Sequence, residues 1–186
     1  TGLSLDDAEL IATLPGGVIG VEVVPDGTLY VASQAGDDTG VWKVPQDGSD
    51  PEPFALISGF PNDVRYDESH DRLLVTESFG GVVYEVPLDA DDPESAASVW
   101  LDDDRLDTES FGANGLTIGT DGDVFVAVTR ATSDDDTNVG RLVRVPVESD
   151  GSAGDATLYL ESEEIFGADG ITARGPHIYV AANSRN

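Results

Sequence analysis

The sequence contains no cysteine, so disulfide bonds and thiolate chemistry are excluded. It has no apolar run of the ~18 residues needed to span a bilayer, and no basic segment followed by an apolar stretch at its start. Because the first residue is Thr1 rather than Met, we expect that a signal peptide has been removed or that the sequence begins inside the gene. The sequence leaves two locations for the protein: the cytoplasm of a salt-accumulating cell, or outside the cell after removal of a signal peptide.

Basic residues are scarce. The sequence has nine lysines and arginines but 37 acidic residues, which gives a formal net charge of −28. Nucleic acid is therefore a poor partner, because no basic stripe exists to release counterions from a phosphate backbone. An anionic membrane surface repels the chain for the same reason. These exclusions favour a small-molecule substrate and leave the oligomeric state open.

The acidic excess consists mainly of aspartate, and Lys43 is the only lysine. Molar salt shortens the Debye length to about 3 Å and screens the self-repulsion of such a chain. The composition resembles that of proteins from halophilic archaea, and we interpret the chain as salt-adapted. The alternative is an acidic surface protein loaded with calcium.

A strand-rich segment occurs four times in the sequence. Residues 17–32 are clearly similar in sequence to residues 111–127. Two less similar copies begin at Gly59 and at Gly167. We aligned the copies on the strand that ends each segment. In this alignment one residue of each copy occupies a shared position: Ile19, Asn62, Asn114 and Asp169. Successive residues at this position are 43, 52 and 55 residues apart. A period of this size, built from short strands, predicts an all-β fold of the β-propeller type.

The repeats predict about four blades: three complete ones over 17–58, 59–102 and 111–161, and a partial one over 167–186. Residues 8–14 resemble the outermost strands and are expected to complete a closing blade, which would tie the chain ends together. We interpret the sequence as a fragment, or the ordered part, of a six-bladed ring, with a four-bladed ring as the alternative.

The shared position predicts a site. Side chains at the entrance of innermost strands face one another across a propeller's channel. Asn62, Asn114 and Asp169 would supply amide and carboxylate oxygens, which suit Ca²⁺ or Mg²⁺. The competing interpretation is that Asn and Asp before Gly only shape turns.

Three short motifs resemble those of the SMP-30/gluconolactonase-like six-bladed propellers, in that family's order: Pro61-Asn62-Asp63, Gly112-Ala-Asn114-Gly-Leu and Gly167-Ala-Asp169-Gly-Ile. The resemblance implies that Asn114 and Asp169 bind a divalent cation, Ca²⁺ before Mg²⁺, Mn²⁺ or Zn²⁺. It implies that Asn62 contacts the substrate or the metal.

One family residue has no counterpart. The family's metal-binding glutamate would lie on a blade preceding the one that carries Ile19, and the sequence contains no such strand. Glu22 is a weak substitute, because it lies three residues beyond the shared position. Asn183 is expected near the rim or, more simply, as a turn residue.

The resemblance implies metal-assisted hydrolysis of a sugar lactone or similar cyclic ester, with Asp169 as catalytic residue that orients or deprotonates water. The alternative is a non-catalytic propeller that binds or scaffolds other molecules. His70 and His177 are expected at blade turns, away from the channel mouth, which argues against a Ser-His-Asp triad.

Overall fold

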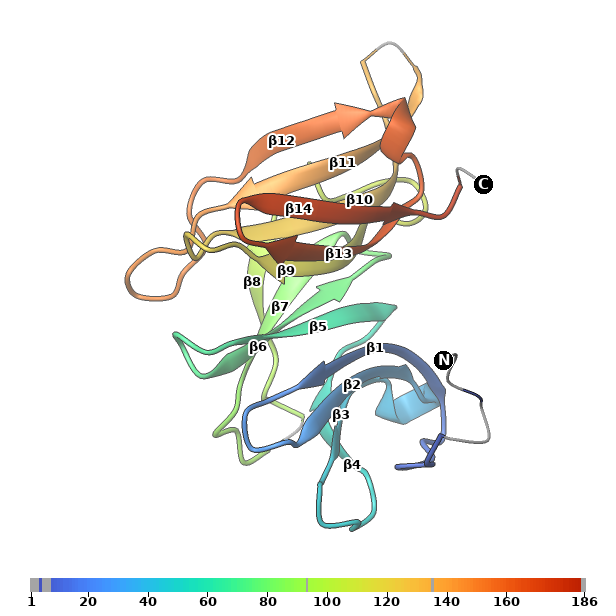
Figure 1. Ribbon diagram of the computed structural model, residues 1–186, viewed down its shortest axis with the longest axis vertical. Helices are drawn as coiled ribbons and strands as arrows, with labels where there is room; N and C mark the ends of the chain where they lie inside the picture. Colours follow the sequence, from blue (N-terminus) through green and yellow to red (C-terminus); the bar gives the residue numbers. More distant parts are fainter. Residues whose placement is uncertain (1–3, 5–7, 93, 135, 185–186) are drawn as a thin grey trace.

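The computed structural model describes residue 4 and residues 8–92, 94–134 and 136–184, and it is built almost entirely of strands (Figure 1). Three antiparallel sheets have four strands each and one has two. The sheets are β1 (Gly17–Val23), β2 (Leu29–Gln34), β3 (Gly40–Val44) and β4 (Glu52–Leu56); β5 (Pro61–Asp67), β6 (Arg72–Glu77), β7 (Val82–Pro87) and β8 (Ser98–Asp102); β9 (Ala113–Ile118), β10 (Val124–Thr132), β11 (Asn138–Val145) and β12 (Thr157–Ser162); and β13 (Ala168–Arg174) with β14 (His177–Ala182).

Each sheet is a meander in which neighbours along the chain are neighbours in space. Tight turns make this order possible. The Asp26-Gly27 and Asp121-Gly122 pairs join first and second strands, and both glycines have a positive φ, 87° at Gly27 and 90° at Gly122. A residue with a side chain is strained in that conformation, so the turn chemistry read from the sequence selects these hairpins.

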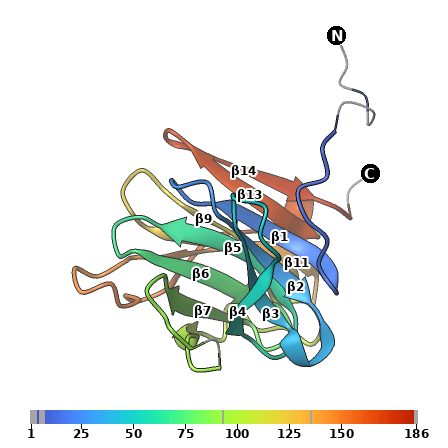
Figure 2. The same cartoon turned by 90° about the horizontal axis from the view of Figure 1, so that it is seen from below.

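The four innermost strands, β1, β5, β9 and β13, lie side by side in chain order (Figure 1). Figure 2 looks along this row of strands from below, so the four sheets overlap in that view. The sheets fan out from these strands and pack face to face. Together with the solved structures compared below, this arrangement confirms the predicted β-propeller fold.

The core lies between the sheets. One buried apolar cluster joins the first and second sheets and includes Val41 and Val75. A second cluster joins the second and third sheets, around Leu74 and Leu116, and a third joins the third and fourth sheets. Alternate strand residues point to opposite faces, so Leu74 and Val75 on β6 pack into different clusters. Each internal sheet is therefore held on both faces.

The described residues do not close into a ring. The outer face of the first sheet carries Val31, Trp42 and Val44, and Ala12 and Leu14 pack on it from the preceding segment. Residues 8–14 form no strand in the structure. Their predicted role as the outer strand of a closing blade therefore stays a prediction.

Short helices appear only in connections within the described part of the chain. Two 3-10 helices, at Gly36–Asp38 and Glu163–Ile165, join strands. Residues 102–111, where the sequence allows a helical turn, contain turns but no helix. No helix among the described residues has the length and apolar character required to cross a membrane.

Candidate functional site

The pairing between the first and second strands is irregular in every sheet, and the irregularity lies at the shared position of the repeats. On β5 it falls between Pro61 and Val64, and on β13 between Ala168 and Ile171. The β9 pairing skips across Asn114 in the same way, and the β1 pairing shifts between Val18 and Gly20. Bulges of this kind redirect side chains. In two copies the bulge is marked in the sequence by a polar residue before glycine, Asn114-Gly115 and Asp169-Gly170. The geometry of the bulges is visible only in the structure.

Each polar side chain at the shared position is held by a partner on the second strand of its sheet or directly after that strand. Asn62 Nδ2 donates to Ser78 Oγ over 2.9 Å, and Asn114 Nδ2 donates to Thr129 Oγ1 over 2.7 Å. In the last sheet Asn183 Nδ2 donates to Asp169 Oδ2. The partners follow the inner residues by 16, 15 and 14 positions. Asn183 is therefore more than the turn residue that the sequence favoured.

Ser78 fixes the orientation of the Asn62 amide. Its hydroxyl donates its single hydrogen to the carbonyl oxygen of Ala113 over 2.6 Å. The Ser78 oxygen can then only accept, so Asn62 must present its NH₂ group there. Among the described residues no hydrogen bond reaches Asn62 Oδ1, and this oxygen remains for a ligand.

Asn62, Asn114 and Asp169 line one cavity of about 440 Å³. Thr129 and Asn183 line it too. The structure thus brings together all three residues that the sequence selected for the site, although it does not test their roles. Ile19, from the first repeat, borders the same cavity and is 39% exposed.

The first sheet supplies an apolar side of the cavity through Val18 and Ile19, and Phe60 and Phe111 extend it. Phe79 contacts both rings. The centroids of Phe60 and Phe111 are 5.1 Å apart, and each is 5.3 Å from that of Phe79. Phe60 and Phe111 precede the shared position of their repeats by two and three residues, but their contact with Phe79 depends on how three connections meet in space.

A charged network lies beside the cavity, between the inner strands. Arg65 Nη1 donates to Glu22 Oε2 over 3.0 Å, and Arg65 Nη2 lies 3.4 Å from Asp63 Oδ2. Asp63 also accepts the backbone N–H of Leu116 over 3.0 Å. Glu22 is therefore occupied by Arg65, and it is not among the residues that line the cavity.

Burial raises the pKa of the Asp63 carboxyl, and the positive charge of Arg65 opposes this shift. The charge of Asp169 raises the pKa of Asp63 further. Burial also raises the pKa of Glu22, again against Arg65. The two acids share one guanidinium at the packed centre, so neither is fully compensated.

Close approach of the inner strands explains two glycines. A Cβ atom at Gly20 would lie 2.4 Å from the carbonyl oxygen of Asn62, and one at Gly115 would lie 2.3 Å from that of Asp169. Asp63 occupies the equivalent place in the second repeat, where its carboxylate fills the space beside Gly20. The glycines allow the shared positions to converge.

A larger cavity of about 910 Å³ opens nearby, between residues 107–110 and the β10–β11 hairpin. Its wall includes Arg130, which also borders the smaller cavity. We assign the candidate site to the smaller cavity, because only there do side chains from all four repeats meet.

The donor set of this cavity fits a hard cation. Amide and carboxylate oxygens are the ligands that Ca²⁺ and Mg²⁺ prefer, and Asn114 and Asp169 supply one of each. The described residues contain no group of three or more His, Cys, Asp or Glu side chains placed to hold a metal. A bound cation would therefore depend on amide oxygens.

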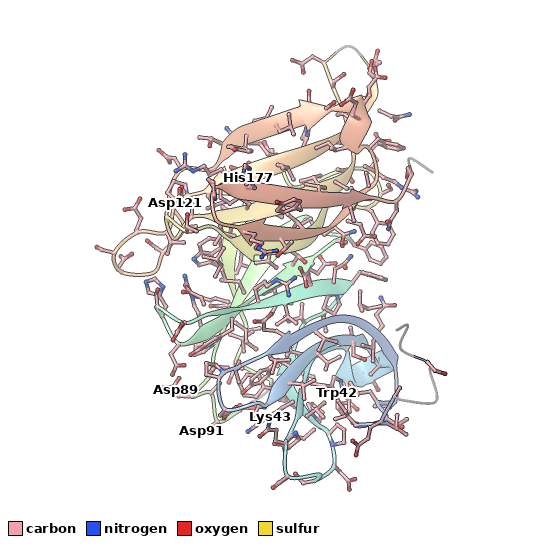
Figure 3. The ribbon with its side chains drawn as sticks, viewed as in Figure 1. Trp42, Lys43, Asp89, Asp91, Asp121 and His177 are labelled. Atoms are coloured by element: carbon pink, nitrogen blue, oxygen red, sulfur yellow. The ribbon has the colours of Figure 1, made fainter. Side chains whose placement is uncertain are left out.

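The two histidines lie at turns, as the sequence predicted. His70 Nδ1 contacts Asp67 Oδ2 over 2.8 Å in the β5–β6 turn. His177 begins β14, at the opposite end of the strand from Asn183 (Figure 3). The same figure shows Asp89, Asp91 and Asp121 on connections between strands, and none of the three lines the cavity.

No protein-family model matches the sequence, and no curated protein matches it significantly. The fold is similar to that of virginiamycin B lyase from Staphylococcus aureus, with 13% identity and a TM-score of 0.50, over 91% of this chain and 64% of that one. It is also similar to a luciferin-regenerating enzyme, with 16% identity and a TM-score of 0.54, over 89% of this chain and 53% of that one. The chain thus spans between about half and just under two thirds of the length of these proteins. At this sequence identity, the structural similarity establishes the β-propeller fold alone.

Proposed function

We propose that this chain belongs to a propeller hydrolase of the SMP-30/gluconolactonase type, which opens a lactone or similar cyclic ester at the cavity of Asn62, Asn114 and Asp169. The observation that carries the proposal is the convergence of these three side chains, from consecutive repeats, on one cavity. The names of the two similar structures describe different chemistries, so the proposal depends on the residues of the site.

Asn114 and Asp169 would hold a divalent cation, with Ca²⁺ the best fit. When bound, it would polarise the ester carbonyl and stabilise negative charge on its oxygen. The cavity's only carboxylate among the described residues is Asp169, so a divalent cation would keep a net positive charge there. Such a charge favours a carbonyl oxygen as a further ligand.

The chain's own residues would carry the proton transfers. Asp169 accepts a proton from water, and the water oxygen bonds to the carbonyl carbon. The ring C–O bond then breaks, and the leaving alkoxide takes up the proton. Asn183 donates to Asp169 Oδ2; each carboxylate oxygen has two lone pairs, so Oδ2 would also be able to bind the cation while Oδ1 accepts the proton from water. Asn62 Oδ1 is positioned to accept a hydrogen bond from the substrate or from this water.

The test compares the wild type with Asp169→Asn in a lactone-opening assay in molar salt. We expect turnover that a calcium chelator abolishes, and a loss of about a hundredfold or more in Asp169→Asn. Asp121→Asn is the matched control, because Asp121 is exposed and lies outside the cavity. Turnover that survives both chelation and Asp169→Asn would contradict the proposal. Ligand binding without turnover in the wild type would instead support the non-catalytic binding module.

A further inference from the structure

The candidate cavity has two chemically different walls. One wall carries the oxygen atoms of Asn62, Asn114 and Asp169. The other, which we call the apolar wall, consists of side chains without any polar atom: Val18, Ile19, Phe60 and Phe111. Both walls border the same space, so a ligand that fills the cavity contacts both.

The apolar wall is open to a ligand. Val18 is 54% exposed and Ile19 is 39% exposed. Phe79, which is 53% exposed, supports Phe60 and Phe111 from outside the cavity. Three of the chain's six phenylalanines are thus gathered at this edge. Mutual ring contacts of this kind restrict the side chains, so the wall is formed before a ligand arrives.

The net charge of the chain favours a neutral ligand over an anionic one. The chain has a formal net charge of −28, yet the described residues that line the cavity include one carboxylate, Asp169, and one cation, Arg130. Without a cation their formal charges cancel, and a divalent cation at Asn114 and Asp169 would add positive charge at the oxygen-bearing wall, where the ester carbonyl oxygen meets it. An anionic substrate would also have to approach through the field of the surface acids.

The apolar wall disfavours a polyhydroxylated ligand. A sugar lactone carries hydroxyl groups on most of its ring carbons, and each one needs a hydrogen-bond partner when it leaves water. The apolar wall offers none from its side chains. An aryl or alkyl substituent would lose no hydrogen bond there and would gain from burial.

We propose that the apolar wall binds an aryl or alkyl substituent, so that the substrate class is a neutral, apolar lactone or ester rather than a sugar lactone. This inference rests on the proposed function, because it names the substrate class of the same site. The oxygen-bearing wall receives the ester group, and the apolar wall receives the substituent.

The test uses two lactams, which resemble lactones but resist hydrolysis: γ-phenyl-γ-butyrolactam and the parent γ-butyrolactam. Dissociation constants are measured by calorimetry or NMR titration in molar salt with calcium. The wild type should bind the phenyl compound about tenfold or more tightly than the parent, as burial of one ring predicts. Equal dissociation constants would overturn the inference.

Two variants locate the effect. Phe111→Ala should remove most of the preference for the phenyl compound. Phe79→Ala, at a largely exposed position where folding is least at risk, should reduce it by a smaller factor. Tyr179→Ala is the control, because Tyr179 is 56% exposed on β14 and lies outside the cavity. A preference that survives in folded Phe79→Ala and Phe111→Ala would contradict the assigned wall.

The lactams separate this inference from the proposed function. If no lactone is opened but the phenyl preference depends on Phe111, the hydrolase proposal fails and the apolar subsite stands. If lactones are opened without any preference for a phenyl substituent, or a sugar lactone is opened faster, the inference fails and the hydrolase proposal stands.

Discussion

Asn62 donates a hydrogen bond from its side-chain amide to the Ser78 hydroxyl, and this hydroxyl donates a hydrogen bond to the carbonyl oxygen of Ala113 in the next blade. This chain of two bonds links the orientation of a candidate site residue to the packing of its neighbouring blade. It exists because Ser78 follows directly after β6, beside the irregular start of β5.

Replacing Ser78 by Ala should release the Asn62 amide while leaving the residue itself in place. We expect a loss of about 1 to 3 kcal/mol in the free energy of unfolding, because two buried hydrogen bonds are removed. The catalytic efficiency should fall by about tenfold or more, since Asn62 is no longer held in one orientation. Steady-state kinetics and urea unfolding measure the two effects.

A double-mutant cycle supplies the control for this prediction. In an Asn62→Ala background, Ser78→Ala should have little further effect on catalytic efficiency. Additive losses in the two positions would mean that Ser78 acts on the site by another route.

Gly115→Ala should destabilise the fold and move Asp169. The new methyl group would lie 2.3 Å from the Asp169 carbonyl oxygen, so the inner strands must separate. We expect a loss of about 1 to 3 kcal/mol, as for other overpacked cores, together with weaker calcium binding.

The matched control for Gly115→Ala is Gly170→Ala. Gly170 follows Asp169 as Gly115 follows Asn114, but a Cβ atom there meets nothing within 4 Å. Its substitution should change the free energy of unfolding by about 0.5 kcal/mol or less. Thermal and denaturant unfolding compare the pair, and equal effects would contradict the close approach of β9 and β13.

Asp63 should make stability depend on pH in an unusual direction. Burial raises its pKa in the folded state, so the folded protein binds more protons than the unfolded chain between the two pKa values. The contribution of Asp63 is therefore fully present below the unfolded pKa of about 3.9 and is lost as the pH rises through the folded pKa.

The groups that face Asp63 are Arg65 and Glu22, with Asp169 adding charge from the last blade. Relative to Asp63→Asn, the wild type should lose unfolding free energy as the pH rises above about 4. Urea unfolding of both proteins at several pH values measures the difference, and a constant offset would show that Asp63 does not titrate there.

Salt should stabilise the chain, because its net charge of −28 opposes compaction. We expect the melting temperature to rise from dilute buffer to molar potassium chloride, with a smaller rise in a variant that neutralises the exposed Asp89 and Asp91. A calcium-loaded surface protein would behave differently, since millimolar calcium would stabilise it far more than magnesium at the same ionic strength.

The strands and the site positions could be predicted because their signals are local. The repeat spacing identifies four strand-rich repeats, and the same alignment selects Asn62, Asn114 and Asp169. The pairing of Glu22 with Arg65 was not predictable, since it joins two blades and depends on how their inner strands pack.

The role of Asn183 shows what a longer comparison of the repeats can find. Ser78, Thr129 and Asn183 each follow the shared position of their repeat by nearly the same number of residues. That offset is visible in the sequence, but its meaning depends on the bulge, which sets which neighbouring side chain the inner residue meets. The aromatic cluster carries a similar signal in part, because Phe60 and Phe111 precede Asn62 and Asn114 by two and three residues, whereas Phe79 follows no such offset.

The irregular pairing at the mouth of each inner strand has a consequence for how such a protein can change. Residues beyond the bulge build the interior between the sheets, whereas the residue at the bulge and its companion on the adjacent strand face the centre. A blade can therefore exchange what it offers to a ligand through two substitutions, with little repacking elsewhere. The four repeats already display such exchange, with isoleucine, two asparagines and an aspartate on one common framework.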